Sequence, residues 1–266
     1  DGRKFTWGGT MGNRLCASLT LTVCLSNMTG ALVTAREPGL LFAHRGGAHE
    51  FEENTMAAFE GSYAKGLRGF ETDVRMTKDG ALVLLHDDGL ERTHNAMGPV
   101  EHLTADELRK VTTKKGGEPV LFLDELLAYF ADKPGIYLEL EMKTRNQDLY
   151  PDSRLDEYCR KLLATSQANR AKDSVYVLTS FDERPLRTLR SLDEDVDLLL
   201  ITDGPCSAAI TKRAKEMGIR RIGVHIDGTS RAAVREAQNA GMRISCWPGH
   251  NLQDYQLAVG LGVDGI

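Results

Sequence analysis

Two short stretches of the chain alternate charged side chains with apolar or neutral ones. The charged members are Glu71, Asp73 and Arg75 in residues 70–76, and Glu139, Glu141 and Lys143 in residues 138–143. Because successive side chains of a β-strand point to opposite faces, each stretch would place its charges on one face. A solvent-exposed antiparallel sheet would explain this pattern without any site. In a parallel sheet covered on both faces, such charges are costly unless they are paired or bind a metal.

Three of these carboxylates could meet around one cation. Glu71, Asp73 and Glu141 would converge if the two strands are neighbours. Carboxylate oxygens without His or Cys partners favour a hard cation such as Ca²⁺ or Mg²⁺ and make zinc the poorer choice. We therefore predict one divalent-cation site, with Ca²⁺ and Mg²⁺ both open.

Two histidines follow apolar runs where strands are expected to end. His44 precedes Arg45, and His86 precedes Asp87. A lone histidine after a strand is more often structural, but two of them beside a carboxylate cluster indicate general acid–base chemistry. Asp87 could orient His86, although neighbouring residues of an extended strand point to opposite faces, which argues against that contact.

Arg45 and Lys143 are the natural contacts for a phosphate group. Arg offers a planar fork to a phosphoryl group, and Lys acts as a point charge. The alternative is that both pair with the neighbouring carboxylates in an ordinary ion-pair network. The other histidines have no comparable setting, and we expect surface or loop positions for His49, His94, His102, His225 and His250.

From residue 40 onward, short aliphatic or β-branched runs alternate with segments of helical periodicity, which is typical of a parallel α/β sheet. Strand candidates span residues 40–44, 69–76, 136–143, 174–178, 196–201, 220–224, 242–247 and 263–266. Helix candidates span residues 55–65, 153–166, 183–191, 207–217, 230–240 and 251–261. Eight such strands predict a TIM (β/α)₈ barrel, in which loops at the carboxyl ends of the strands build the active site.

Residues 81–130 are longer than a usual connection between a strand and its helix. They contain an apolar run over residues 81–85 and helical patterns around Asp106 and Glu125, which predicts a small insertion after the second strand. The chain stops on its eighth strand, so we expect the closing helix to be lacking.

Residues 1–37 differ in character from the rest. An uncharged run follows Arg14 and ends in Val33-Thr34-Ala35, which resembles a signal-peptide cleavage site. A disordered extension is the alternative. A signal peptide would make the protein periplasmic or secreted, and otherwise we expect it in the cytoplasm. Residues 38–266 are expected to form one barrel domain.

The composition excludes several classes of partner. A net charge of -5 gives no electrostatic reason to expect nucleic acid, because phosphate backbones are bound through clustered Lys and Arg. With 41% hydrophobic and 27% charged residues, the chain has the composition of an ordinary globular protein. We therefore expect no stable membrane span in the mature chain.

Taken in order, the motifs resemble the glycerophosphodiester phosphodiesterase family. They are His44-Arg45-Gly46-Gly47, Glu53-Asn54-Thr55, Glu71-x-Asp73, His86-Asp87, Leu90-Glu91-Arg92-Thr93, Glu141-x-Lys143, Ser180-Phe181, Trp247 and the closing Gly262-Val263-Asp264-Gly265-Ile266. The resemblance covers residues 40–266. It departs at Glu139, where the family often has Asn, and in the residues after Trp247.

The resemblance implies a TIM barrel that holds one divalent cation through Glu71, Asp73 and Glu141, with His44 and His86 as the acid–base pair. Arg45 and Lys143 would hold the phosphate. Trp247 would pack against the glycerol or the head group, with a plain core position as its alternative.

The implied reaction is metal-dependent hydrolysis of a small glycerophosphodiester to an alcohol and glycerol 3-phosphate, in glycerol and lipid metabolism. The alternatives are phospholipase D-like hydrolysis of lysophospholipids and a non-catalytic phosphate-binding barrel. The head group, the role of each histidine, the attacking oxygen (water or a substrate hydroxyl) and the oligomeric state stay open.

Overall fold

Strands and helices alternate along the chain in the computed structural model, which describes residues 39–266. The strands are β1 (Phe42–Ala43), β2 (Gly69–Met76), β3 (Leu82–Leu84), β4 (Tyr137–Met142), β5 (Val175–Ser180), β6 (Leu198–Ile201), β7 (Arg221–His225) and β8 (Arg243–Trp247). They pair in the order β1-β2-β4-β5-β6-β7-β8, all parallel. β3 lies off this path and pairs antiparallel with β2.

The backbone around Gly265 joins the two edges of this sheet. Gly265 forms parallel bridges with Ser245 of β8 and with Leu40 before β1. A Cβ atom on Gly265 would lie 2.5 Å from the ring of Phe42, so only glycine allows this close approach. The pairing closes the strands into an α/β barrel, as predicted. The prediction of a full strand over residues 263–266 was wrong in extent, because only these single bridges form there.

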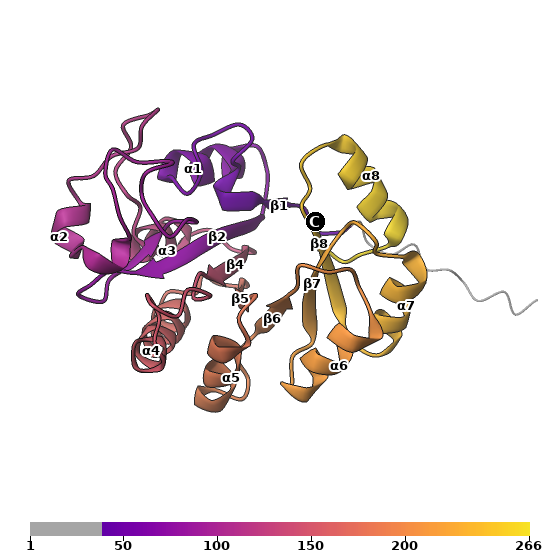
Figure 1. Cartoon of the computed structure of the whole chain (residues 1–266). Coiled ribbons are helices and arrows are strands. Elements are labelled where there is room, and N and C mark those ends of the chain that lie inside the picture. The colour runs from indigo at the N-terminus through magenta and orange to yellow at the C-terminus, as the bar shows by residue number, and fades with distance from the viewer. Residues whose placement is uncertain (1–38) are drawn as a thin grey trace, which may run out of the picture. The chain divides into compact units, whose positions relative to one another are not determined.

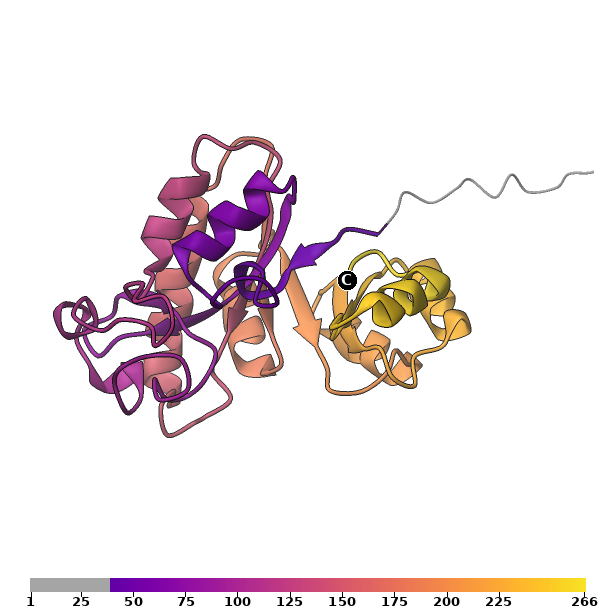
Figure 2. The ribbon, with the colours of Figure 1, turned by 90° about the horizontal axis from the view of Figure 1, so that it is seen from above.

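Helices surround the strands (Figures 1 and 2), and α4 to α8 follow one another around the outside. The helical elements are η1 (His44–Gly46), α1 (Met56–Ala64), η2 (Val100–His102), α2 (Ala105–Leu108), α3 (Leu123–Phe130), α4 (Asp152–Ala168), α5 (Glu183–Leu192), α6 (Ala208–Glu216), α7 (Arg231–Asn239) and α8 (Leu252–Leu261). Several begin at an N-cap whose side chain accepts a backbone N–H, as Ser207 does for α6 and Ser230 for α7. These polar residues fix where the two helices begin.

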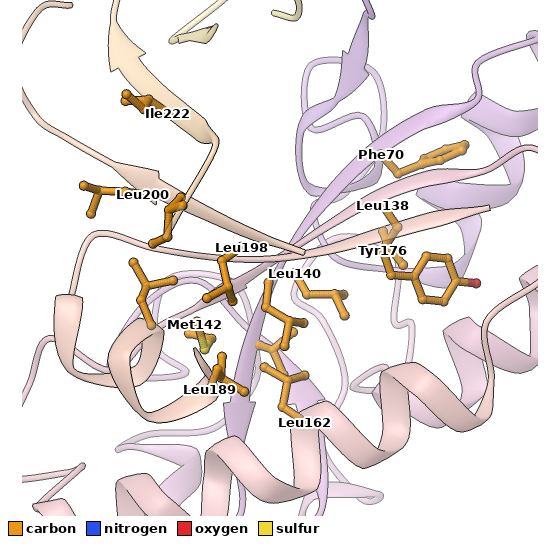
Figure 3. Packing of buried hydrophobic residues seen from close by; sticks show 14 of the residues in the cluster. Phe70, Leu138, Leu140, Met142, Leu162, Tyr176, Leu189, Leu198, Leu200 and Ile222 are labelled. Carbon is orange, nitrogen blue, oxygen red and sulfur yellow. The ribbon is translucent and has the colours of Figure 1, made fainter. Parts of the chain in front are cut away.

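Apolar strand residues face the helices and leave the charged ones facing inward. Leu138 and Leu140 of β4 are fully buried and pack in the same cluster as Leu162 of α4 and Leu189 of α5 (Figure 3). Strand alternation then directs Glu139, between the two leucines, to the other face. The hydrophobic effect on the outer face thus fixes the inward orientation of the acidic residues.

The segment between β2 and α3 has a small core of its own. Its buried apolar residues are Val83, Leu85, Leu90, Val100, Leu108, Val120 and Phe122. A buried ion pair between Arg75 of β2 and Glu101 of η2, with a distance of 3.0 Å, ties the segment to the barrel. This is the insertion predicted after the second strand.

Residues 1–37, where the signal peptide was predicted, lie outside the described residues. Within residues 39–266, no helix has the length and the apolar character needed to cross a bilayer.

Candidate active site

Three buried carboxylates meet inside the barrel. Glu71 and Asp73 lie on β2 and Glu141 on the adjacent β4, where Asp73 is directly opposite Glu141. One carboxylate oxygen from each residue lies within 4.8 Å of the others. Oε1 of Glu71 and Oδ1 of Asp73 are buried and accept no hydrogen bond from the described residues. Such orphaned oxygens, in an all-carboxylate set, fit a hard divalent cation.

The crowding of these carboxylates perturbs their ionisation. Burial, together with the charges of Asp73 and Glu141, raises the pKa of Glu71 well above its ordinary value. Burial also raises the pKa of Glu141. Asp73 behaves oppositely, because the nearby cation of Lys143 and further partners outweigh the effect of burial and lower its pKa. At least one member of the cluster therefore favours ionisation at neutral pH.

Arg45 and Lys143 border the cluster on two sides. Nε of Arg45 lies 3.4 Å from Oδ2 of Asp73, and Nζ of Lys143 lies 2.7 Å from Oε1 of Glu141. The backbone N–H of Arg45 also donates to Oε2 of Glu71 over 3.0 Å. Arg45 and Lys143 thus form the ion pairs with carboxylates that were the alternative to phosphate binding. Both side chains also line the cavity described below.

His44 stands at the rim of the cluster. It begins η1 instead of ending a strand, because Gly46 and Gly47 turn the backbone with φ angles of 80° and 120°. Its Nε2 lies 3.7 Å from Oε2 of Glu71. Burial among the site residues and the adjacent Arg45 cation lower the pKa of His44 to about 4, so the ring is neutral at physiological pH.

His86 is held by its own neighbour. Nδ1 of His86 lies 2.6 Å from Oδ1 of Asp87. The expectation that these residues would point apart was wrong, because β3 ends at Leu84 and the backbone bends from residue 86 onward. Arg92 and His86 lower the pKa of Asp87 to about 2 against the effect of burial. An ionised carboxylate only accepts, so Nδ1 carries the hydrogen of this contact and Nε2 is left available to a substrate.

A cavity of about 500 Å³ opens beside these groups. It is lined by His44, Arg45, Glu71, His86, Glu141 and Lys143 on one side and by Phe181, Ile201 and Trp247 on the other. The indole of Trp247 meets the ring of Phe181 edge to face at 5.3 Å. The structure thus brings predicted residues from η1, β2, β4, β8 and the loop after β3 to the lining of one cavity, and Asp73 joins Glu71 and Glu141 in the acidic cluster beside it. Barrel enzymes place their active sites at the carboxyl ends of their strands.

Several residues near the site were not assigned to it from the sequence. Asn54 donates to Oδ2 of Asp73 over 3.0 Å and fixes that carboxylate. Glu139 lies in the cavity wall, where burial raises its pKa to about 7. His49 and His250 are exposed in loops, as expected, and also line the cavity. The motif around Asn54 was visible in the sequence, but the two histidines come from separate loops with no shared pattern.

The family model of the glycerophosphoryl diester phosphodiesterase family matches residues 44–266. A glycerophosphodiester phosphodiesterase of Caldanaerobacter subterraneus is 28% identical over 237 residues, which cover 85% of this chain and 92% of that protein. The crystal structure of a Silicibacter pomeroyi protein has a TM-score of 0.77 at 24% identity, over 86% of this chain and 89% of the other. An Oleispira antarctica phosphodiesterase, solved with the product sn-glycerol-3-phosphate, has a TM-score of 0.76 at 20% identity over 85% of this chain and 91% of its own.

A closed parallel barrel with ionisable groups gathered at the carboxyl ends of its strands defines an α/β-barrel enzyme. The chain belongs to the glycerophosphoryl diester phosphodiesterase family and is a phosphoric diester hydrolase.

Proposed function

We propose that the chain hydrolyses small glycerophosphodiesters to an alcohol and glycerol 3-phosphate, in a reaction that requires one divalent cation and two histidines. The observation that carries this proposal is the convergence of three buried carboxylates, two histidines and two cations on one cavity. The names of the relatives support the substrate class, since the protein of Caldanaerobacter subterraneus is a glycerophosphodiester phosphodiesterase.

Glu71, Asp73 and Glu141 would hold the cation, either Ca²⁺ or Mg²⁺, through oxygens that lie within 4.8 Å of one another. When bound there, a divalent cation supplies positive charge to the phosphoryl oxygens and makes a nearby hydroxyl easier to deprotonate. Arg45 and Lys143 add fixed positive charge beside the same space and would orient the phosphate.

The two histidines have different surroundings that favour different roles. His44 is neutral at physiological pH and is ready to accept the proton of the attacking hydroxyl. The ring of His86 is held through Nδ1 by Asp87, and we assign to its Nε2 the transfer of a proton to the leaving alcohol. Trp247 and Phe181 would form the apolar wall against which the glycerol or the head group packs.

The test is release of glycerol 3-phosphate from glycerophosphocholine and glycerophosphoethanolamine, with added Ca²⁺ or Mg²⁺ and with EDTA. We expect cation-dependent release that His44→Ala and His86→Ala abolish. His102→Ala is the matched control, because His102 is exposed and lies on η2 in the insertion. No release from the folded, cation-loaded protein would reject the proposal. Release from lysophosphatidylcholine alone would favour a phospholipase D-like activity.

We also propose that residues 1–37 contain a signal peptide and that the mature protein acts outside the cytoplasm, as the uncharged run that ends at Ala35 indicates. N-terminal sequencing of the protein from its host tests this. A mature chain that begins within a few residues of Ala35 supports it, and an uncleaved chain in the cytoplasm contradicts it.

A further inference from the structure

Arg92 lies outside the cavity lining but contacts two carboxylates that lead to the site. Its Nη1 donates to Oε2 of Glu53 over 2.8 Å, and its Nη2 donates to Oε1 of Glu53 over 2.6 Å. Its Nε contacts Oδ2 of Asp87, and its Nη2 also donates to Oδ1 of Asp87 over 3.1 Å. One guanidinium therefore holds both oxygens of both carboxylates.

Each carboxylate in turn contacts a residue of the proposed machinery. Oε1 of Glu53 accepts from Nη1 of Arg45 over 3.1 Å, and Oδ1 of Asp87 accepts from Nδ1 of His86 over 2.6 Å. A continuous chain of polar contacts thus runs from Arg45 through Glu53, Arg92 and Asp87 to His86. It spans two loops that enter the site from different strands, since Glu53 lies between η1 and α1 whereas Asp87 follows β3.

The charges explain why an arginine is needed at the centre. Glu53 and Asp87 are both anionic, and without a cation between them they would repel each other and draw the two loops apart. The contacts with Arg92 and Arg45 outweigh burial and lower the pKa of Glu53, so this carboxylate stays ionised. A guanidinium has five donors in a planar fork, which serve two carboxylates at once, whereas a lysine ammonium is a point charge without that geometry.

We propose that Arg92 is a positioning residue for the reaction: by bridging Glu53 and Asp87 it fixes Arg45 toward the phosphate and the His86 ring toward the leaving group. This inference rests on the proposed function, because it assigns to Arg92 the orientation of two groups that act in that reaction. It gives a physical role to the Leu90-Glu91-Arg92-Thr93 motif, which the site residues themselves leave unexplained.

The test compares Arg92→Ala and Arg92→Lys with the wild type in the glycerophosphocholine assay. We expect kcat to fall by about 10- to 100-fold in Arg92→Ala, the usual effect of removing an orienting partner of a site residue. Free guanidinium ion should restore part of the activity of Arg92→Ala, because it can occupy the vacated position. Arg92→Lys should stay well below the wild type, since it retains the charge but not the fork.

Arg109→Met is the matched control. Arg109 lies in the same insertion, its side chain is 52% exposed against 47% for Arg92, and it pairs with Glu125 over 3.0 Å away from the site. A merely structural role for Arg92 predicts similar small effects in both variants and no rescue by guanidinium. That outcome, or an Arg92→Lys variant with full activity, would overturn the proposal.

A second readout does not depend on activity. In ¹⁵N NMR spectra of the imidazole rings, the His86 resonances should lose the signature of an Nδ1–H donor in Arg92→Ala and keep it in Arg109→Met. Unchanged His86 resonances in folded Arg92→Ala would contradict the proposal. An inactive wild type with this signature intact would instead reject the proposed function and leave the bridge in place.

Discussion

Neighbouring carboxyl groups of the acidic cluster have pKa values that are shifted in opposite directions. Glu71 has a raised pKa because of burial and the neighbouring carboxylates, whereas Lys143 and further partners lower that of Asp73. Burial also raises the pKa of Glu141, so a cation that binds to all three oxygens must compete with proton binding at Glu71 and Glu141. Cation binding and proton binding therefore compete at this site.

From this competition we predict that the affinity for Ca²⁺ or Mg²⁺ rises with pH. A raised pKa means that Glu71 keeps its proton at a pH where an exposed glutamate, with a pKa of about 4.3, has lost it. As the pH falls through that range, a larger fraction of the Glu71 carboxyl groups is protonated, and the cation must compete with these protons. Isothermal titration calorimetry at one mildly acidic and one mildly alkaline pH checks this. Equal affinity at both values would contradict the assignment.

Replacing Glu71 should separate stability from function. We predict that Glu71→Gln loses cation binding but makes the cation-free protein more stable by about 1 kcal/mol or more, because glutamine is neutral without the proton that the buried Glu71 must take up. The glutamine can still accept from the backbone N–H of Arg45.

Urea unfolding in EDTA measures this change in the free energy of unfolding. Glu60→Gln is the control, since Glu60 is exposed on α1. A less stable Glu71→Gln variant would show that the carboxylate is already compensated without a cation.

β2 and β4 carry the three carboxylates of the site. Both strands could be predicted from the sequence because charged side chains alternate with apolar or neutral ones along them. The prediction of residues 69–76 agrees with β2 (Gly69–Met76), because apolar residues on the outer face and charged ones on the inner face leave only one orientation. The same alternation predicts that Glu71 and Asp73 share one face of β2 and that Glu141 lies on the matching face of β4.

Contacts between side chains of different loops could not be predicted from the alternation of residues along strands. The bridge of Arg92 between Glu53 and Asp87 joins residues 39 and 5 positions apart, and no periodicity links them. The sequence predicts that His86 and Asp87 point apart, but the structure shows them in contact. The contact depends on where β3 ends and where the backbone bends, which strand alternation does not predict. Strand patterning thus predicts what an element faces, while loop geometry depends on the packing of the insertion.

The insertion is fastened to β2 by a buried network. Arg75 donates to Oε1 of Glu101 over 3.0 Å, and the hydroxyl of Tyr150 donates to the same oxygen over 2.7 Å. Arg75 also donates to the backbone carbonyl of His86 over 3.2 Å and contacts Asp88. The network therefore sets the position of the loop that carries a proposed catalytic histidine.

We predict that Arg75→Met destabilises the protein by about 3–5 kcal/mol, because it leaves the buried Glu101 carboxylate without its cation. The double variant Arg75→Met/Glu101→Leu should regain part of this loss, since no unpaired charge remains. Arg109→Met, which removes an exposed ion pair, should have a much smaller effect than Arg75→Met. Urea unfolding of the four proteins, wild type included, gives the comparison. Equal effects of Arg75→Met and Arg109→Met would contradict a structural role for the network.

For the molecule as a whole, the site links cation binding to folding. The carboxylates come from two neighbouring strands, β2 and β4, so the cation site exists only when these strands are paired in the folded barrel. A cation at about 100 times its dissociation constant should then stabilise the folded chain by about 2.7 kcal/mol. We predict a higher Tm with Ca²⁺ or Mg²⁺ than with EDTA, and no such difference in Asp73→Asn. The same cation-dependent rise in Asp73→Asn would place the binding elsewhere.

The most direct test is a ³¹P NMR time course of glycerophosphocholine with the cation-loaded protein, in parallel with EDTA-treated protein and with His86→Ala. We predict that the phosphodiester resonance is replaced by that of glycerol 3-phosphate only in the cation-loaded wild type. Persistence of the diester signal with folded, cation-loaded wild type, or equal conversion by His86→Ala, would contradict the proposed roles of the acidic cluster and the two histidines.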